Sequence, residues 1–339
     1  MSSSFANEKP AGYKNHVENI AVVGAAGRSG GVITDALVQG GKHRVTGITR
    51  PGSTSEMPAG LHSVKKVDYD SHSSLVEALR GQDVLIITLP VMAPRETHTK
   101  LIDAAVEAGV SWIMPNEWGV DVSKVEMGTD VLVRSGIVAI REYIEKTGGG
   151  KTAWMGLCTG FWYEFSLAGT EARYGFDFDK KELTLYDEGT TKINTSTWPQ
   201  VGRAVASLLS LKILPESKDD ASPSLSQFKN KPVYVSSFFV SQRDMFESVL
   251  RVMGDSEKDW KVTYEDVAAR FKRGQEIFKQ GQTVGFGILL YARLFYKDGA
   301  GDINALLANK ALGLPEEDFD RATKVGVEMA IAGNTNAIH

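Results

Sequence analysis

The sequence contains very little cysteine and no surplus of positive charge. Cys158 is the only cysteine among 339 residues. This excludes an intrachain disulfide and a cysteine-based metal cluster, and it is typical of a reducing compartment, so we expect a cytoplasmic protein. The formal net charge is −4, and Lys and Arg form no cluster with interleaved aromatic residues. Nucleic-acid binding is therefore not expected.

Long apolar runs and metal-ligand patterns are also missing. No run approaches the roughly 20 residues needed to cross a bilayer, so we expect no membrane association. The first residues resemble neither a signal peptide nor a transit peptide, and we expect a flexible polar leader over residues 1–17. The six histidines show no ligand spacing such as His-Glu-x-x-His, so no catalytic metal is expected.

The first half of the chain alternates short β-branched runs with amphipathic helical patterns, which predicts a parallel sheet with crossover helices. The expected strands are "NIAVVGA", "HRVTGITR", "SVKKVDYD", "DVLIITLP", "VSWIMPNEWG" and "KTAWMGLCTG". The expected helices are "SGGVITDALVQGG", "HSSLVEALRGQ", "ETHTKLIDAAVEAG" and "TDVLVRSGIVAIREYIEKTGGG". The pattern indicates an α/β fold with a Rossmann-type, doubly wound sheet over residues 18–165.

Aromatic residues become more frequent after Gly160, in "GFWYEF", "ARYGFDFD" and "FFVSQRDMF". We expect a smaller C-terminal α+β lobe for substrate over residues 166–339. Within it, segments at about 190–213 and 231–240 are expected to return to the Rossmann sheet.

The stretch "VVGAAGRSGG" places Gly24, Gly27 and Gly30 in a G-x-x-G-x-x-G spacing between an expected strand and an expected helix. Glycine permits a tight turn, close approach of a pyrophosphate and close helix packing, and a helix N-terminus attracts negative charge. This predicts a dinucleotide site that also includes Ala26, Arg28 and Ser29. A turn required only for packing is the alternative.

The end of the second expected strand selects the cofactor. NAD-specific sites place an acid there, whereas "GITRPGS" presents Arg50. Arg50, helped by Arg28, can bind a 2′-phosphate through charge-assisted bonds, so the sequence favours NADP or NADPH. Other cofactor contacts are expected at strand ends, namely at Asp68, Tyr69, Thr88, Leu89, Pro90, Pro115, Gly160 and Phe161. Solvated arginines and polar strand ends are the alternatives.

With these stretches, with "LIDAAVEAGVSWIMPNEWG" and with "TGFWYEF", the chain resembles the NmrA-like and isoflavone-reductase-like branch of the atypical short-chain dehydrogenases, especially its fungal members. The segment from Pro115 to Gly119 stands where that family has Pro-Ser-Glu-Phe-Gly. The resemblance implies an NADPH-binding Rossmann lobe, a small substrate lobe and reduction of phenolic or other conjugated small molecules.

The sequence departs from this branch where catalysis is concerned. No tyrosine is followed four residues later by lysine, and the lysine that the isoflavone-reductase branch carries on the next helix would align near residues 137–139, where there is none. The remaining candidates are Asn116 as a donor to a carbonyl oxygen, Glu117 or Glu164 as acid or base, and Tyr163 as proton donor. Each can instead be structural.

Three functional hypotheses follow. The first is an NADPH-dependent reductase of a small aromatic or polycyclic secondary metabolite, acting as a monomer or homodimer. The second is a non-catalytic, NADP-sensing regulator of the NmrA type, motivated by the missing lysine. The third is an isomerase or cyclase that uses bound cofactor without net turnover.

Overall fold

A seven-stranded parallel sheet forms the centre of the N-terminal lobe in the computed structural model, which describes residues 5–90 and 93–333. The strand order is β11-β6-β5-β4-β1-β2-β3, and every neighbouring pair is parallel. The strands are β1 (Asn19–Val23), β2 (Arg44–Thr49), β3 (Ser63–Lys66), β4 (Val84–Ile87), β5 (Trp112–Met114), β6 (Ala153–Cys158) and β11 (Lys231–Tyr234). All six strands predicted from the sequence are present.

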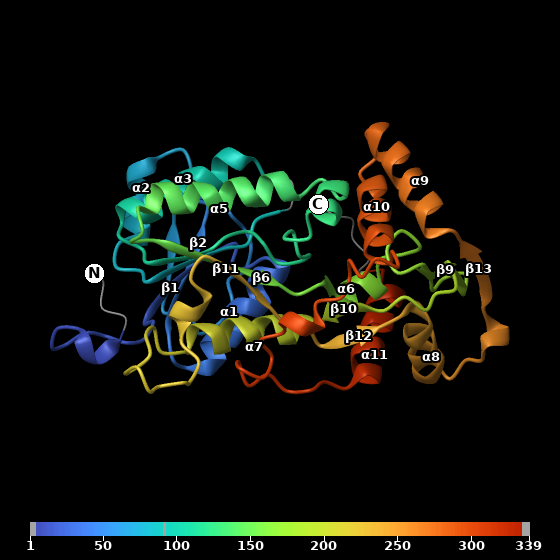
Figure 1. The fold of residues 1–339 in the computed structure, drawn as a ribbon. Coiled ribbons are helices and arrows are strands. Elements are labelled where there is room, and N and C mark those ends of the chain that lie inside the picture. The colour runs from blue at the N-terminus through green and yellow to red at the C-terminus, as the bar shows by residue number, and fades with distance from the viewer. Residues whose placement is uncertain (1–4, 91–92, 334–339) are drawn as a thin grey trace.

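Helices cover both faces of this sheet (Figure 1). On one face lie α2 (His72–Leu79), α3 (Arg95–Glu107) and α5 (Arg134–Gly148). On the other face α1 (Arg28–Gly40) packs against α7 (Trp198–Leu209), where Gly202 lets the two helices approach closely. The strands are buried on both faces, which explains why they read as continuous apolar runs. The predicted doubly wound α/β fold is confirmed.

Strands β1 and β4 pair directly with each other, and the strand order reverses between them. From β1 the chain continues to β2 on one side, whereas from β4 it continues to β5 on the other side. In such sheets the crevice outside the carboxyl ends of the strands at this point is the usual ligand site. The glycine turn after β1 and the loop after β4 both lie at this edge.

One helix prediction needs correction. The stretch from Thr129 to Gly150 was expected to form a single helix, but the structure has α4 (Val125–Asp130) and then α5, separated by residues 131–133. Leu132 in this break has a φ of 63° and a side chain that is largely exposed. The local pattern of apolar residues continues through the break, so the sequence gives no sign of it.

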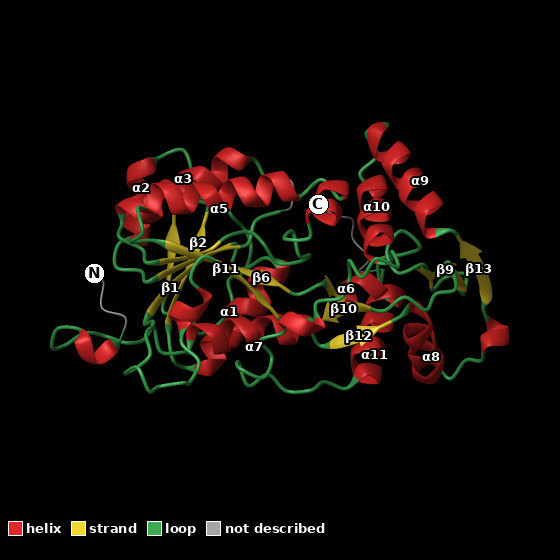
Figure 2. Cartoon of the chain, viewed as in Figure 1, coloured by secondary structure: helices red, strands yellow, loops and turns green. Residues whose placement is uncertain are grey.

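The C-terminal lobe contains two three-stranded sheets, ordered β12-β10-β7 and β13-β9-β8. Their strands are β7 (Phe161–Trp162), β8 (Phe176–Asp177), β9 (Glu182–Tyr186), β10 (Ile193–Ser196), β12 (Phe238–Val240) and β13 (Lys261–Glu265). The helices of the lobe are α6 (Tyr163–Leu167), α8 (Gln242–Met253), α9 (Val267–Lys279), α10 (Val284–Leu294) and α11 (Phe319–Ile331). Figure 2 shows these helices beside the short strands. The buried core of this lobe is rich in aromatic side chains.

Two parts of the second half return to the first lobe. Strand β11 pairs with β6, and α7 covers the sheet beside α1, whereas β10 lies in the separate three-stranded sheet with β12 and β7.

The segment expected as a flexible leader is attached to the rest of the chain, because the N–H groups of Ala6 and Asn7 donate to the main-chain oxygens of Pro215 and Glu216. Within the described ranges, no helix combines the length and hydropathy that crossing a membrane requires.

Candidate functional site

The glycine turn after β1 can exist only with glycine at two of its positions. Gly24 has a φ of 79°, and a Cβ atom there would lie 2.0 Å from the main-chain oxygen of Thr88. A Cβ at Gly30 would lie 2.1 Å from the oxygen of Gly24. The turn, the first turn of α1 and the end of β4 are therefore packed backbone against backbone.

The N-terminus of α1 is open to a ligand. Gly27 is its N-cap, is exposed and provides no side-chain cap, so the first N–H groups of the helix have no side-chain acceptor. Ala26 and Ser29 flank this position. Such an uncapped N-terminus after a glycine turn fits the pyrophosphate of a dinucleotide.

Arg50 and Tyr69 follow the neighbouring strands β2 and β3. Burial raises the pKa of Tyr69 to about 12, and the positive charge of Arg50 opposes this shift. Arg50 is exposed and makes no ion pair with any acid in the described part of the chain. Asp68 instead closes a local turn by accepting the N–H of Asp70 at 2.9 Å. An unpaired arginine beside an aromatic ring fits a phosphorylated adenosine.

The side chain of Asn116 is occupied by the backbone. Its Oδ1 accepts the N–H of Leu89 (3.2 Å), and its Nδ2 donates to the oxygen of Leu89 (2.9 Å). Thr88 similarly donates to the oxygen of Val23 at 2.7 Å. Asn116 therefore fixes the loop after β4, with Pro90 exposed and Pro115 buried. These bonds use the amide oxygen and one of the two amide N–H groups, so the structure gives Asn116 a bridging role, and its role as a donor to substrate stays a prediction.

Glu117 is buried and held by Arg141 of α5. Arg141 Nε donates to Glu117 Oε2 at 2.9 Å, and its Nη2 bonds Oε1. Burial raises the pKa of Glu117, and the hydrogen bonds and charge of Arg141 oppose the shift. The carboxylate also lies directly over the Cα of Gly156 in β6. These contacts indicate a structural pair that joins β5, β6 and α5.

Tyr163 and Phe161 belong to the core of the second lobe. Tyr163 has no exposed surface, and its hydroxyl bonds Thr323 of α11 at 2.7 Å. Phe161 stacks on Tyr291 with ring centroids 3.9 Å apart, and a Cβ at the preceding Gly160 would lie 2.1 Å from the oxygen of Asn194. The predicted proton donor is therefore enclosed, and the turn at Gly160 is needed for packing on β10.

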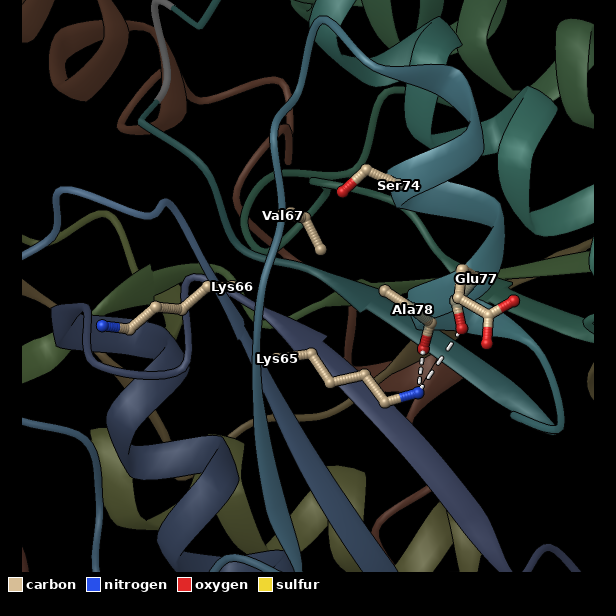
Figure 3. Close-up of a pocket in the computed structure, with 6 residues that line it drawn as sticks. All are labelled: Lys65, Lys66, Val67, Ser74, Glu77 and Ala78. Carbon is tan, nitrogen blue, oxygen red and sulfur yellow. Dashed lines mark hydrogen bonds between the residues drawn. The ribbon is translucent and has the colours of Figure 1, made fainter.

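Two pockets lie outside these groups. One, of about 440 Å³, lies between α4 and α5, and Val138 and Ala139, where the family lysine would align, are among its lining residues. The other, of about 350 Å³, runs along β3 and α2. Figure 3 shows Lys65 there reaching the main-chain oxygens of Glu77 and Ala78, while Lys66 points away. None of the predicted site residues lines either pocket.

Aromatic rings from the second lobe meet the glycine turn. The Cζ of Arg28 lies 5.1 Å from the ring centroid of Phe165 and 5.9 Å from that of Trp198. Trp162 lies 6.1 Å from Phe165 and 6.4 Å from Trp198, centroid to centroid. We call these four residues, Arg28, Trp162, Phe165 and Trp198, the aromatic seam. Arg28 was expected to assist Arg50, but its guanidinium packs on these rings instead.

Glu164 lies next to the seam as a buried carboxyl group. Its Oε2 accepts the N–H of Trp198 at 3.2 Å. Burial raises the pKa of Glu164 from 4.5 to about 7, and its hydrogen bonds to backbone N–H groups oppose the shift. The group is therefore partly protonated near neutral pH.

The protonation of Glu164 predicts a pH-dependent stability. The unfolded chain releases this proton at lower pH than the folded chain, so stability contributed by the protonated group is lost as pH rises from 4.5 to about 7. Relative to Glu164→Gln, the wild-type free energy of unfolding should fall by about 3 kcal/mol over this window. Urea titrations of both proteins at several pH values measure the difference, and Glu328→Gln, at an exposed position of α11, provides the control. Parallel curves for wild type and Glu164→Gln would contradict the assignment.

The glycine turn, the open N-terminus of α1 and the buried Glu117 all lie in one segment of the chain. Residues 16–172, somewhat less than half of the chain, match the model of the NmrA-like family. Over this segment the chain is similar to the NmrA-like family. Its fold and its isoflavone-reductase-like features agree with this similarity, as the resemblance of "PNEWG" and "TGFWYEF" predicted.

Several similar proteins match nearly the whole chain. Oxidoreductase aprR of Aspergillus flavus is 27% identical over 306 residues, which are 89% of this chain and 96% of that protein. AtPrR2, solved with NADP⁺ and (+)-pinoresinol, has a TM-score of 0.70 at 18% identity and covers 93% of this chain and 100% of its own. The NADPH-dependent quinone oxidoreductase QOR2 of Escherichia coli, solved with NADPH, has a TM-score of 0.64 at 18% identity, covering 90% and 98%. Proteins of this fold therefore hold NADP⁺ or NADPH.

The sequence pattern predicted a cofactor edge but missed part of the second lobe's contribution. Phe165 and Trp198 reach Arg28 of the glycine turn, and the buried Arg173 lies against the ring of Phe165. Aromatic enrichment after Gly160 was the available signal, but aromatic runs are more often core than pocket, and only contacts distinguish the two.

Proposed function

We propose that this chain is an NADPH-dependent oxidoreductase that reduces a small aromatic substrate. The observation that carries the proposal is the open N-terminus of α1 behind a glycine turn that no other residue can replace, at the β1/β4 switch point. Arg50, exposed and without an acidic partner, favours the 2′-phosphorylated cofactor.

Different residues would bind the different parts of the cofactor. The N–H groups around Gly27 and Ser29 would hold the pyrophosphate, Arg50 the 2′-phosphate and Tyr69 the adenine face. When bound, the reduced nicotinamide supplies a hydride. The rings of Phe165 and Trp198 would exclude water beside it and offer an apolar surface to a flat substrate. Asn116 and the Glu117–Arg141 pair hold the strand ends that shape this edge.

The comparisons support this proposal at the level of chemistry. Oxidoreductase aprR shares almost the full length of the chain, and AtPrR2 was solved with an aromatic ligand together with NADP⁺. The aromatic seam provides this chain with matching apolar surface.

Cofactor selectivity tests the proposal directly. Calorimetric titration with NADPH, NADP⁺, NADH and NAD⁺ should show a preference for the phosphorylated forms. Arg50→Ala should weaken NADPH binding by roughly 10- to 100-fold, because it removes charge-assisted bonds to a phosphate, and should leave NADH binding nearly unchanged. Arg44→Ala is the matched control, since Arg44 is an exposed arginine at the opposite end of β2 that pairs with Glu18. Absence of binding by all four dinucleotides would refute the cofactor assignment.

A non-catalytic NADP sensor is the second candidate, and the occupied side chains favour it. Asn116, Glu117 and Tyr163 are each engaged in buried or backbone interactions, and the segment 137–139 has no lysine. A turnover screen with quinones and phenolic carbonyl compounds, run on the protein used for calorimetry, separates the candidates. NADPH consumption supports the oxidoreductase, whereas tight binding without any turnover supports the sensor.

A further inference from the structure

Arg173 is a buried guanidinium without an acidic partner. Its residue is 4% exposed, and it lies between α6 and β8 in the second lobe. Nη1 donates to the main-chain oxygen of Phe165 at 2.5 Å, and no carboxylate of the described residues lies within ion-pair distance. Leaving a buried charge uncompensated is costly, so the arrangement requires an explanation.

The other buried arginines show how this protein normally neutralises such a charge. Arg270 pairs with Glu171 and Glu265. Arg293 pairs with Asp130 and Asp298, at 2.6 and 2.8 Å. One acid of each pair, Glu171 or Asp130, comes from a distant part of the chain, so the fold brings carboxylates to buried arginines. At Arg173 it brings none.

The surroundings of Arg173 add a second positive charge instead. Its Cζ lies 3.6 Å from the ring centroid of Phe165, and the Cζ of Arg28 lies 5.1 Å from the same centroid. Burial lowers the pKa of Arg173, Tyr291 opposes this, and the charge of Arg28 adds to the lowering. Two guanidinium groups thus share one aromatic ring at the point where the second lobe meets the glycine turn.

The remaining polar atoms of the aromatic seam are donors. The Nε1–H groups of Trp162 and Trp198 are both buried and have no acceptor among the described residues. Glu164 beside the seam accepts the main-chain N–H of Trp198 and forms no ion pair with Arg28 or Arg173. The two cations and two free N–H donors that border these rings therefore fit a negatively charged acceptor attached to an aromatic ring.

We propose that Arg173, with Arg28 beside it, forms an anion-binding subsite that holds the carboxylate or phenolate of an acidic aromatic ligand against the ring of Phe165. The inference rests on the proposed function, since it names the substrate class of the oxidoreductase. The same chemistry is found in the phosphates of the dinucleotide, so the test separates these two sources.

The test compares aromatic acids with their uncharged amides. Benzoate, 4-hydroxybenzoate and 2-naphthoate, each with the matching amide, are titrated into the full chain by calorimetry at neutral pH, with and without NADPH. We expect at least one acid to bind the wild type roughly 10- to 100-fold more tightly than its amide. Arg173→Met should remove this preference while leaving binding of the amide and of NADPH nearly unchanged.

Two further variants keep the result interpretable. Arg173→Lys retains the charge and should keep part of the preference for the acid. Arg251→Met removes an exposed arginine of α8 that pairs with Asp320 and should keep all of it. Arg173→Met should also be at least as resistant to urea as the wild type, because it removes an uncompensated buried charge, whereas a purely structural Arg173 predicts a loss of stability.

The outcomes show whether the subsite exists and which anion it binds. If no acid binds better than its amide, or if Arg173→Met leaves the preference intact, the subsite does not exist as proposed. If Arg173→Met weakens NADPH instead, the anion is a cofactor phosphate and the substrate assignment is wrong. If the wild type binds the acids through Arg173 but no dinucleotide, the subsite stands and the proposed oxidoreductase function fails.

Discussion

Replacing Gly30 by alanine is expected to abolish tight NADPH binding and to lower the free energy of unfolding by about 3 kcal/mol. The added Cβ would lie 2.1 Å from the oxygen of Gly24 and 2.5 Å from Oγ1 of Thr88, and neither atom can move without shifting the turn or the end of β4. The N–H groups of α1 would then miss the phosphates, and affinity should fall by roughly 100-fold.

The neighbouring glycine is the matched control for this experiment. A Cβ at Gly31 has its nearest heavy atom, the oxygen of Ala25, at an ordinary 3.7 Å. Gly31→Ala should therefore retain NADPH binding and keep or slightly raise stability, because alanine is favoured over glycine in a helix by up to about 1 kcal/mol. Equal effects of the two substitutions in calorimetry and urea unfolding would show that packing of the turn does not control binding.

Replacing Arg141 by methionine is expected to lower the free energy of unfolding by about 4 kcal/mol, because Glu117 would remain buried without its partner. The side chains of Glu117 and Arg141 are 2% and 13% exposed, so water cannot substitute for the lost bonds. Since burial raises the pKa of Glu117, the loss should be smaller at acidic pH, where the carboxyl group takes up a proton. Urea titration across pH measures both effects.

The double variant Glu117→Gln/Arg141→Met separates a structural role from a catalytic one. Removing both charges should restore most of the stability lost in Arg141→Met. If Glu117 is structural, the double variant should also keep turnover with any substrate that the screen identifies. A stable double variant without turnover, but with normal NADPH binding, would return Glu117 to the catalytic candidates.

A cofactor half could be predicted from the sequence because its proposed determinants are local. Gly24, Gly27 and Gly30 lie within one turn, and Arg50 follows its strand directly, so spacing alone predicts a role for these residues. The partners of Asn116 and Tyr163 could not be predicted in this way, since a polar residue at a strand end looks identical whether its partner is a ligand, as predicted, or Leu89 and Thr323, as found.

The sequence by itself determined the doubly wound sheet, its first six strands and the glycine turn, because periodicity and turn chemistry are properties of neighbouring residues. Only the tertiary structure decided which charges are compensated. Glu117 meets Arg141, Glu164 is enclosed beside Trp198, and Arg173 reaches the ring shared with Arg28 without meeting an acid. These pairings join residues distant in the chain, and their energies depend on burial and on the partner that the fold supplies, neither of which spacing along the sequence contains.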